Sequence, residues 1–489
     1  MKKVVVVGAG IAGLSAAIYA KRSGFDVTLI EQHSIAGGMC TSWKRKGYLF
    51  EGAVHWLTGS SPKTELYQLW KDTGVLGDNV KVILNDIFYS VEHDGVIINL
   101  YRDIDKTVKH LFENSPNDAK RLRRLASDVK TLSCMEMPVY DIKSVKAQNP
   151  KRMKLSSLFK MMPAILKMGK LNNISCGEYA KQFEHLGIRR LFLLLTDEYS
   201  AGSLVVTLAT LNTGDGGYPE GGSLAMADRM IKTFNSLGGK LLLNAQVKNV
   251  IIKNKKVTSV KLENETLDAD AVIVTQETIA AAKQLFDIPL NEDWLTDICK
   301  NTKPAVCTFI SIGICAEILP SPVPAWILDE PVIYAGKKIT EISFYNYIKY
   351  KGYAPEGCTA LTTAFMGDTY DFWKNAKEEG RYEKEKQNLA DQIKKVVCKK
   401  FPQAEGKIDV IDIATPLTYE RYTGAYHGSW MSISGAGDKM KSFSGDCKNV
   451  SGLYFAGHRL MSPGGLPVAV FTGRRAAQMV CRQFDVMFK

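Results

Sequence analysis

The sequence predicts an α/β fold of two domains, and three observations support this prediction. The chain opens with a strand–turn–helix–strand pattern, and a second strand–turn–helix pattern follows more than 400 residues later, over 452–482. The length of 489 residues is too great for one compact core. We therefore expect a parallel sheet built from both ends of the chain, with a second domain inserted between them.

The opening pattern contains a glycine-rich turn in the context of a βαβ unit. An apolar strand leads to Gly8, Gly10 and Gly13, and a helix and a second strand then end at Glu31. Gly8 permits a tight turn, Gly10 allows a pyrophosphate to approach the backbone, and Gly13 allows close packing of helix on strand. The helix N-terminus attracts phosphate, and a carboxylate at position 31 can accept the hydroxyls of a ribose. The opening predicts a Rossmann-type dinucleotide site, for either NAD or FAD.

The same stretch also resembles a secretory signal peptide, because Met1-Lys2-Lys3 precedes an apolar run over 4–20. Three spaced glycines would break an apolar helix, and Glu31 would have no role there. We therefore expect the dinucleotide turn and no signal peptide.

The middle of the chain predicts two inserted segments. Gly37-Gly38 can present backbone N–H groups to a phosphate. The expected helices are 64–71, 188–196, 224–237 and 375–398, and the expected strands are 240–244, 247–252, 257–262, 271–275, 305–314 and 359–365. These elements predict a dinucleotide-binding domain over 1–70, 214–282 and 419–489, and a substrate-binding domain over 71–213 and 283–418.

Charge is unevenly distributed in this chain of net charge +12. Segment 143–170 holds eight basic residues and no acidic one, interleaved with apolar residues near helical spacing. This basic amphipathic segment suits an anionic membrane surface, or it covers a core as a solvated helix, kinked at Pro163 unless a helix starts there. Nucleic acid is not an expected partner, since no recognition motif accompanies the charge. Scattered cysteines and histidines predict no metal site and a reducing, cytoplasmic compartment. Docking of the basic segment would place the protein peripherally at the inner face of the membrane.

The C-terminal pattern provides a second candidate ligand contact. A strand ends at Gly457, a turn follows, and a helix opens at Leu466-Pro467. Proline is favoured in the first turn of a helix. The positive end of this helix can face a ligand that gains negative charge.

These motifs together resemble the phytoene desaturase, carotenoid isomerase and retinol saturase superfamily of FAD-dependent oxidoreductases, which shares its fold with amine oxidases. The motifs are Gly8-x-Gly10-x-x-Gly13 with Glu31, Gly37-Gly38 with Gly47-Tyr48-x-Phe50-Glu51, Tyr218-Pro219-x-Gly221-Gly222, Thr415-Pro416-Leu417-Thr418 with Arg421-Tyr422, and Leu453-Tyr454-x-Ala456-Gly457 with Pro463-Gly464-Gly465-Leu466-Pro467. The resemblance implies a two-domain FAD-binding fold of the glutathione-reductase type, with a discontinuous mixed α+β substrate domain.

The resemblance also implies site residues. The expected contacts to FAD are Gly8, Gly10, Ile11, Ala12, Gly13, Glu31, Gln32, Gly37, Gly38, Met39, Val247, Gly457, His458, Gly465, Leu466 and Val468. The flavin carries the chemistry in such proteins, and His458, Tyr422 and His55 are the candidates for proton transfer beside it. Met39, His458 and Ala53 depart from residues that many relatives carry, which leaves the substrate class open.

Three functions follow from these features. The first is desaturation, saturation or cis–trans isomerisation of carbon–carbon double bonds in an apolar isoprenoid or polyene. The second is an amine- or porphyrinogen-oxidase-like reaction. The third is a non-catalytic carrier of prenylated lipid, which the complete glycine motif with Glu31 disfavours.

Overall fold

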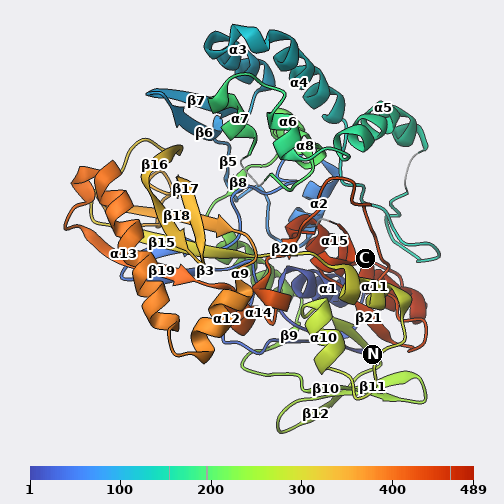
Figure 1. The fold of residues 1–489 in the computed structure, drawn as a ribbon. Helices are drawn as coiled ribbons and strands as arrows, with labels where there is room; N and C mark the ends of the chain where they lie inside the picture. The colour runs from blue at the N-terminus through green and yellow to red at the C-terminus, as the bar shows by residue number, and fades with distance from the viewer. Residues whose placement is uncertain (153–154, 194–196, 463) are drawn as a thin grey trace.

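The computed structural model describes residues 1–152, 155–193, 197–462 and 464–489, together with the side chains of these residues except those at 155–158 and 160. Lys154 of the basic segment, the end of the predicted helix 188–196 and Pro463 of the last motif lie outside the described residues. The fold is mixed α/β, as expected, with a parallel sheet and a larger mixed sheet (Figure 1).

The parallel sheet brings together strands from three distant parts of the sequence. Its five strands lie in the order β21-β13-β1-β2-β9, and every neighbouring pair is parallel. The strands are Lys3–Val7 (β1), Asp26–Ile30 (β2), Lys240–Leu242 (β9), Ala271–Val274 (β13) and Leu453–Phe455 (β21). Their residues are mostly apolar and buried. Val4 and Val6 share a core cluster with residues of the helices Ile11–Arg22 and Leu466–Gln483, whereas Val5 and Val7 share another with Val250, Val257 and Val260.

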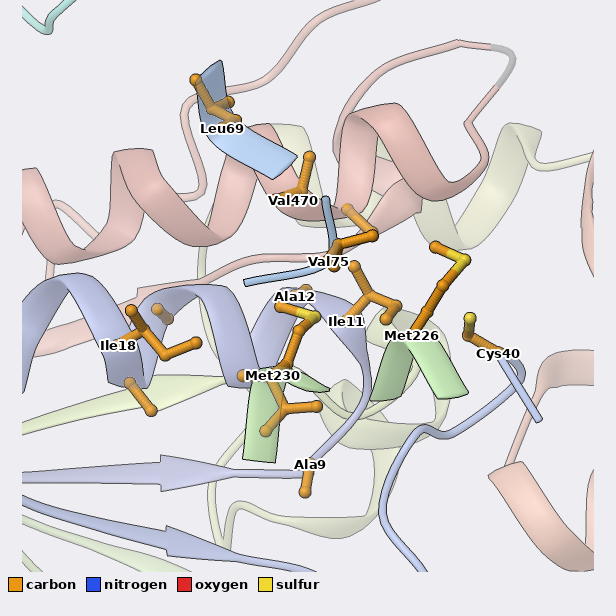
Figure 2. Close-up of a cluster of buried hydrophobic side chains, with 14 of the residues drawn as sticks. Ala9, Ile11, Ala12, Ile18, Cys40, Leu69, Val75, Met226, Met230 and Val470 are labelled. Carbon is orange, nitrogen blue, oxygen red and sulfur yellow. The ribbon is translucent and has the colours of Figure 1, made fainter. Parts of the chain in front are cut away.

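Helix α1 (Ile11–Arg22) and helix α15 (Leu466–Gln483) pack against each other beside this sheet. A Cβ on Gly473 would lie 2.3 Å from the carbonyl oxygen of Ala12, so glycine lets the two backbones approach closely. Ser15 Oγ donates a hydrogen bond of 2.7 Å to the carbonyl oxygen of Val470. Figure 2 shows side chains of α1, α15 and α9 (Gly222–Ser236) meeting in one core.

The second sheet has seven strands in the order β19-β15-β18-β17-β16-β6-β7. Neighbouring strands are antiparallel, apart from β16 and β6, which are parallel. The strands are Ile87–His93 (β6), Val96–Tyr101 (β7), Cys307–Ile314 (β15), Val323–Tyr334 (β16), Lys337–Asn346 (β17), Thr359–Met366 (β18) and Ile408–Ala414 (β19). Strands β6, β7, β16, β17 and β19 were not expected from the sequence.

The expected helix over 375–398 is in fact two helices, α12 (Tyr370–Glu378) and α13 (Tyr382–Lys400). Gly380 separates them in a left-handed conformation, with φ +72°. Both helices contribute to the core beneath the seven-stranded sheet, Trp373 from α12 and Ile393 from α13.

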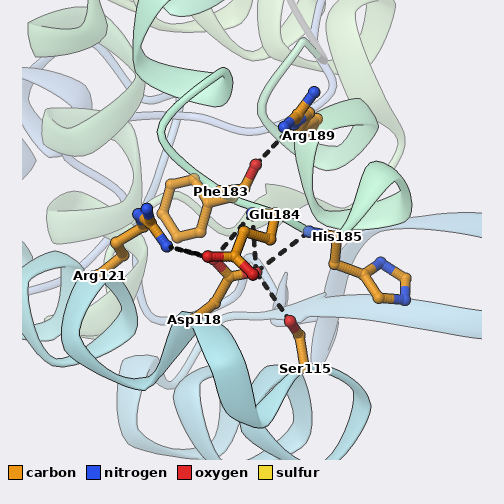
Figure 3. A network of polar contacts seen from close by, with 7 residues as sticks. All are labelled: Ser115, Asp118, Arg121, Phe183, Glu184, His185 and Arg189. Carbon is orange, nitrogen blue, oxygen red and sulfur yellow. Dashed lines mark hydrogen bonds and ion pairs between the residues drawn. The ribbon is translucent and has the colours of Figure 1, made fainter.

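The helices between β7 and β8 form a separate core cluster. They are Ile104–Asn114 (α3), Ala119–Leu132 (α4), Leu155–Leu171 (α5), Cys176–Ala180 (α6), Leu186–Phe192 (α7) and Ala201–Asn212 (α8). Figure 3 shows how a buried carboxylate joins α4 to the loop before α7: Asp118 accepts the N–H of Glu184 at 2.8 Å and the hydroxyl of Ser115 at 2.8 Å. Burial opposes ionisation of Asp118, but these hydrogen bonds lower its pKa below the usual value.

The remaining elements are short. They are Ser42–Arg45 (β3), Tyr48–Glu51 (β4), Val82–Ile83 (β5), Tyr218–Pro219 (β8), Asn249–Lys253 (β10), Lys256–Lys261 (β11), Thr266–Asp268 (β12), Pro304–Ala305 (β14), Met431–Ser432 (β20), Glu65–Asp72 (α2), Thr278–Gln284 (α10), Asp293–Asn301 (α11) and Pro416–Thr423 (α14). Most expected strand and helix positions match these within a few residues. The predicted domain boundaries stay a prediction. Among the described helices, none combines the length and the apolar character needed to span a bilayer.

Candidate functional site

A large cavity lies between the two sheets and has a volume of about 870 Å³. One part is lined by residues at the carboxyl ends of the parallel strands, including Gly8 after β1 and Glu31 after β2. Open α/β sheets bind ligands at this edge. Another part is lined by residues of β15, β17 and β18, such as Phe309 and Tyr345.

The glycine turn leaves space at the first part of the cavity. A Cβ on Gly10 would meet only Gly37 O, at 3.8 Å, and Gly38 Cα, at 3.9 Å, among atoms within 4 Å. Gly38 has φ +60°, which keeps its backbone close to Gly10. Gly13 is different: its Cβ would lie 1.9 Å from Gly8 O, and Gly13 does not line the cavity. Gly10 therefore leaves room for a ligand, while Gly13 serves the packing of α1 on β1.

Glu31 is buried with its carboxylate at the same edge. Its Oε2 accepts the N–H of Ala9 at 2.9 Å, and its Oε1 accepts the N–H of His33 at 3.0 Å. These bonds hold the carboxylate beside the glycine turn, and a carboxylate retains further lone pairs for two hydroxyls. Gln32, which follows Glu31 in the chain, and Val247 also line the cavity.

The start of α15 also faces the cavity. Gly457, Gly465 and Leu466 line it, and Gly457 has φ +149°. Thr472 Oγ1 accepts the N–H of Gly457 at 3.0 Å, which fixes the end of β21 against α15. Val468 is buried and is not among the lining residues. Its expected role as a cofactor contact stays a prediction.

His458 has an unsatisfied buried atom at this position. Its Nδ1 makes no hydrogen bond in the structure, although the ring lines the cavity. Burial, and next the charge of Arg459, lower the pKa of His458 to about 3. The imidazole is therefore neutral near pH 7, and its orphaned nitrogen is available to a bound group.

The features of this edge fit a dinucleotide-type flavin. They are the space above Gly10, the carboxylate of Glu31, the N-terminus of α15 and the unpartnered His458. Ile11, Ala12, Gly37, Gly38 and Met39 also line the cavity. The sequence prediction therefore named residues that the fold brings together, apart from Gly13 and Val468.

The second part of the cavity carries a group of aromatic side chains. His55 stacks on Phe309, with ring centroids 6.5 Å apart, and its ring lies 5.0 Å from that of Tyr345. Burial lowers the pKa of His55, so this imidazole is also neutral, and its Nδ1 has no partner. The aromatic wall consists of Trp56, Phe88, Phe309, Phe344, Tyr345 and Trp430. The sequence pointed to His55 beside this wall but to none of the other rings with which it packs.

Tyr422 lines the cavity at its exposed edge, with half of its surface (51%) accessible. Its ring lies 5.6 Å from that of His33, two residues after Glu31. It is therefore placed with the nucleotide-side residues rather than with the aromatic wall. His427, the nearest histidine in sequence to Tyr422, stacks between Tyr370 and Tyr426 and is not among the lining residues.

A buried ion pair supports the turn that carries His458. Arg459 Nε donates to Glu277 Oε1 at 2.9 Å, and the two side chains are 1% and 4% exposed. Arg459 also donates to Ser432 Oγ at 2.7 Å, so the pair links η4 (His458–Leu460) to β20. Glu277 additionally accepts the N–H of Ala280 at the start of α10.

Comparison with known proteins is consistent with this geometry. A 1-hydroxycarotenoid 3,4-desaturase of a Flavobacterium species is 24% identical over 98% of this chain and 99% of its own length. A chloroplastic prolycopene isomerase of Daucus carota is 22% identical over 97% of this chain and 79% of its own. The solved cyclohexylamine oxidase of Brevibacterium oxydans has a TM-score of 0.59 at 15% identity, covering 99% of both chains. The model of the flavin-containing amine oxidoreductases matches residues 11–481, which confirms the superfamily inferred from the motifs: the chain belongs to the flavin-containing amine oxidoreductase family.

Proposed function

We propose that this protein is an FAD-dependent oxidoreductase that acts on carbon–carbon double bonds of a long apolar substrate of the isoprenoid or polyene kind. The observation that carries the proposal is one cavity that joins the glycine turn to the aromatic wall. FAD, when bound, supplies the redox chemistry. Gly10 and Glu31 would hold its adenosine diphosphate half, and the start of α15 its ring half.

The aromatic wall favours a polyene over an amine. Aromatic side chains bury large apolar area and stack with conjugated ligands. The acidic residues among the described lining are already engaged: Glu277 pairs with Arg459, Asp86 pairs with Lys106, and Glu31 lies at the nucleotide side. A cationic amine would therefore find no free carboxylate among the described residues of the aromatic wall.

His55 and His458 are the side chains suited to hold or move a proton in this cavity. Both imidazoles are neutral near neutral pH, and the Nδ1 atom of each has no partner in the structure. A neutral imidazole donates from one nitrogen and accepts at the other. His55 lies at the aromatic wall, so we assign proton transfer to the substrate to His55 before Tyr422.

The test begins with the purified protein. We expect bound FAD by absorbance and by chromatography of the released cofactor, and turnover of a C40 polyene or a shorter isoprenoid in detergent micelles. H55Q should reduce kcat, while W56L and F309L should raise KM. Protein that takes up no flavin when FAD is supplied refutes the proposal, and oxygen-dependent turnover of amines without turnover of polyenes supports the amine-oxidase alternative.

We further propose that α5 docks on an anionic lipid bilayer. Phe159, Met162 and Leu166 lie on one face of this helix and are 72%, 46% and 63% exposed. Arg152 and Lys170 are exposed at its two ends, whereas Lys167 is held by Asp128 at 2.6 Å. An apolar face beside cationic residues is typical of helices that lie in the membrane interface.

Vesicle sedimentation tests the docking of α5. We expect co-sedimentation with phosphatidylglycerol-containing vesicles and little with neutral ones, because each exposed cation contributes about 1 kcal/mol at an anionic surface. The double variant R152E/K170E, or F159S/L166S, should bind at least tenfold more weakly. The double variant K253E/K255E, with two exposed charge reversals on β10 and in the turn after it, is the matched control. Equal binding by R152E/K170E and the control removes the claim.

A further inference from the structure

Two cysteines lie opposite each other where strands β15 and β18 begin to separate. The strands pair in antiparallel register, with Ile314 opposite Thr359. One step further along this register places Cys315 opposite Cys358. The sequence gives no sign of this pair, because 42 residues lie between the two positions and no C-x-x-C spacing is present.

The backbone hydrogen bonds identify the geometry of the pair. The N–H of Cys315 donates to the carbonyl of Lys407 at 2.8 Å, and the N–H of Cys358 donates to Pro355 at 3.1 Å. Neither N–H is directed to the opposite cysteine, so this is a non-hydrogen-bonded pair. Cα atoms in such pairs are about 4.5 Å apart, and their side chains are close. That separation lies within the range of roughly 4.4–6.8 Å that a disulfide spans.

The two thiols interact with each other, and one of them is accessible. Cys315 is exposed, whereas Cys358 is buried and its Sγ donates to the carbonyl oxygen of Glu356 at 3.7 Å. The interaction with the neighbouring thiol raises the pKa of Cys315 above its usual value. The raised pKa leaves a smaller fraction of Cys315 as thiolate near pH 7, and this fraction, which is the form that reacts with disulfides, grows as the pH rises.

We propose that Cys315 and Cys358 form a reversible disulfide that joins β15 to β18. The thiolate of Cys315 attacks a small-molecule disulfide such as oxidised glutathione, forming a mixed disulfide and releasing one thiol. Cys358 then attacks the Cys315 sulfur and releases the second thiol. The two protein thiols lose two electrons and two protons, and the glutathione disulfide gains them.

The cysteine pair lies outside the cavity, at the far end of two strands that line it. Phe309 of β15 and Ala364 of β18 line the cavity and lie opposite each other, further along the same strand pair. Near the cysteines, the ring of Tyr48 contacts Gly313, and its hydroxyl donates to Asp409 at 2.6 Å. The disulfide would link β15 to β18 at the end of the strand pair that lies away from the cavity. Its formation therefore does not depend on the proposed flavin chemistry.

Peptide mass mapping of the full-length protein tests the pair. After incubation with oxidised glutathione near pH 8, we expect a peptide linking Cys315 to Cys358 that dithiothreitol releases. The rate should increase up to about tenfold per pH unit below the thiol pKa. C315S should abolish the linked peptide, whereas C134S, which removes another exposed cysteine, should leave it unchanged.

A second measurement needs no variant. Phenylarsine oxide binds adjacent dithiols, so on the unmodified protein it should protect Cys315 and Cys358 together from alkylation. Protection of the pair and the linked peptide support the inference. Glutathione retained on Cys315 as a mixed disulfide, with Cys358 still a free thiol and no arsenical protection, overturns it.

Discussion

Replacing each of two glycines of the same turn with alanine is expected to affect different properties, flavin binding in one case and fold stability in the other. Gly10 faces the cavity with nothing closer than 3.8 Å to an added Cβ. The added Cβ of Gly13 would lie 1.9 Å from Gly8 O. G10A should therefore lose flavin and keep the fold, while G13A should weaken the fold itself.

The magnitudes follow from these distances. A carbon and an oxygen in contact are about 3.3 Å apart, so G13A must move α1 from β1 by roughly 1.4 Å. Overpacking of this kind costs about 3 kcal/mol, and alanine regains about 1 kcal/mol of helix propensity. The net loss is about 2 kcal/mol, or about 2 °C in Tm, since a chain of this length has an unfolding entropy near 1 kcal/mol/K.

For G10A, the backbone of Gly10 has φ −74° and ψ −177°, which alanine adopts without strain. Replacing glycine at a helix N-cap costs under about 1 kcal/mol. The added methyl group occupies the space assigned to the phosphates, so we expect flavin affinity to fall at least tenfold, or about 1.4 kcal/mol.

The assay combines urea unfolding of the apoprotein with flavin titration, monitored by quenching of flavin fluorescence. G77A is the control, because an added Cβ at Gly77 meets no atom within 4 Å. If G10A binds flavin within twofold of the unmodified protein, the assignment of the phosphates to this turn is refuted. If G13A unfolds at the same urea concentration as G77A, the packing argument is wrong.

Three further predictions concern buried polar groups. The pKa of His458 is about 3 in the folded protein, so the unfolded chain takes up a proton on this histidine first as the pH falls. The free energy of unfolding of the apoprotein should therefore fall by about 1.4 kcal/mol per pH unit below about pH 6.5. H458Q should lose that part of the pH dependence in urea unfolding at pH 4.5–7. R459M should lower the free energy of unfolding by about 3–5 kcal/mol, because it leaves Glu277 buried without its cation. The double variant R459M/E277L should recover most of this loss, and no recovery would contradict the pairing. D118N should lower the free energy of unfolding by about 1.5–3 kcal/mol at pH 7, and by progressively less as the pH falls through the lowered pKa of Asp118. An equal loss at pH 3 would contradict the assignment of Asp118 as an ionised acceptor.

The parallel sheet was predictable because its signals are local. Gly8, Gly10 and Gly13 are fixed by backbone geometry within one turn, and Pro467 marks the start of α15. The split at Gly380 was missed because charged residues on both sides continue a helical pattern.

The aromatic wall could not be predicted from local sequence signals. Alternation along β15 indicates that Cys307 and Phe309 share a face, but not which surface lies opposite. His55 and Tyr345 reach that face from segments 290 residues apart. Such pairings are set by tertiary packing. Strands β16 and β17 were missed because β16 pairs with β17 on one side and with the distant strand β6 on the other, and neither partner can be identified from local sequence.

The packing of α1 against α15 has a consequence for biosynthesis. Roughly 440 residues separate the end of α1 from the start of α15, and at about 5–20 residues per second the ribosome needs roughly 20–90 s to make them. During that time the face of α1 that packs on α15 at Ala12 stays uncovered, and half of the proposed ring site does not exist. Stable flavin capture is therefore an event that follows translation, and the nascent N-terminal unit is a natural client for chaperones until α15 emerges.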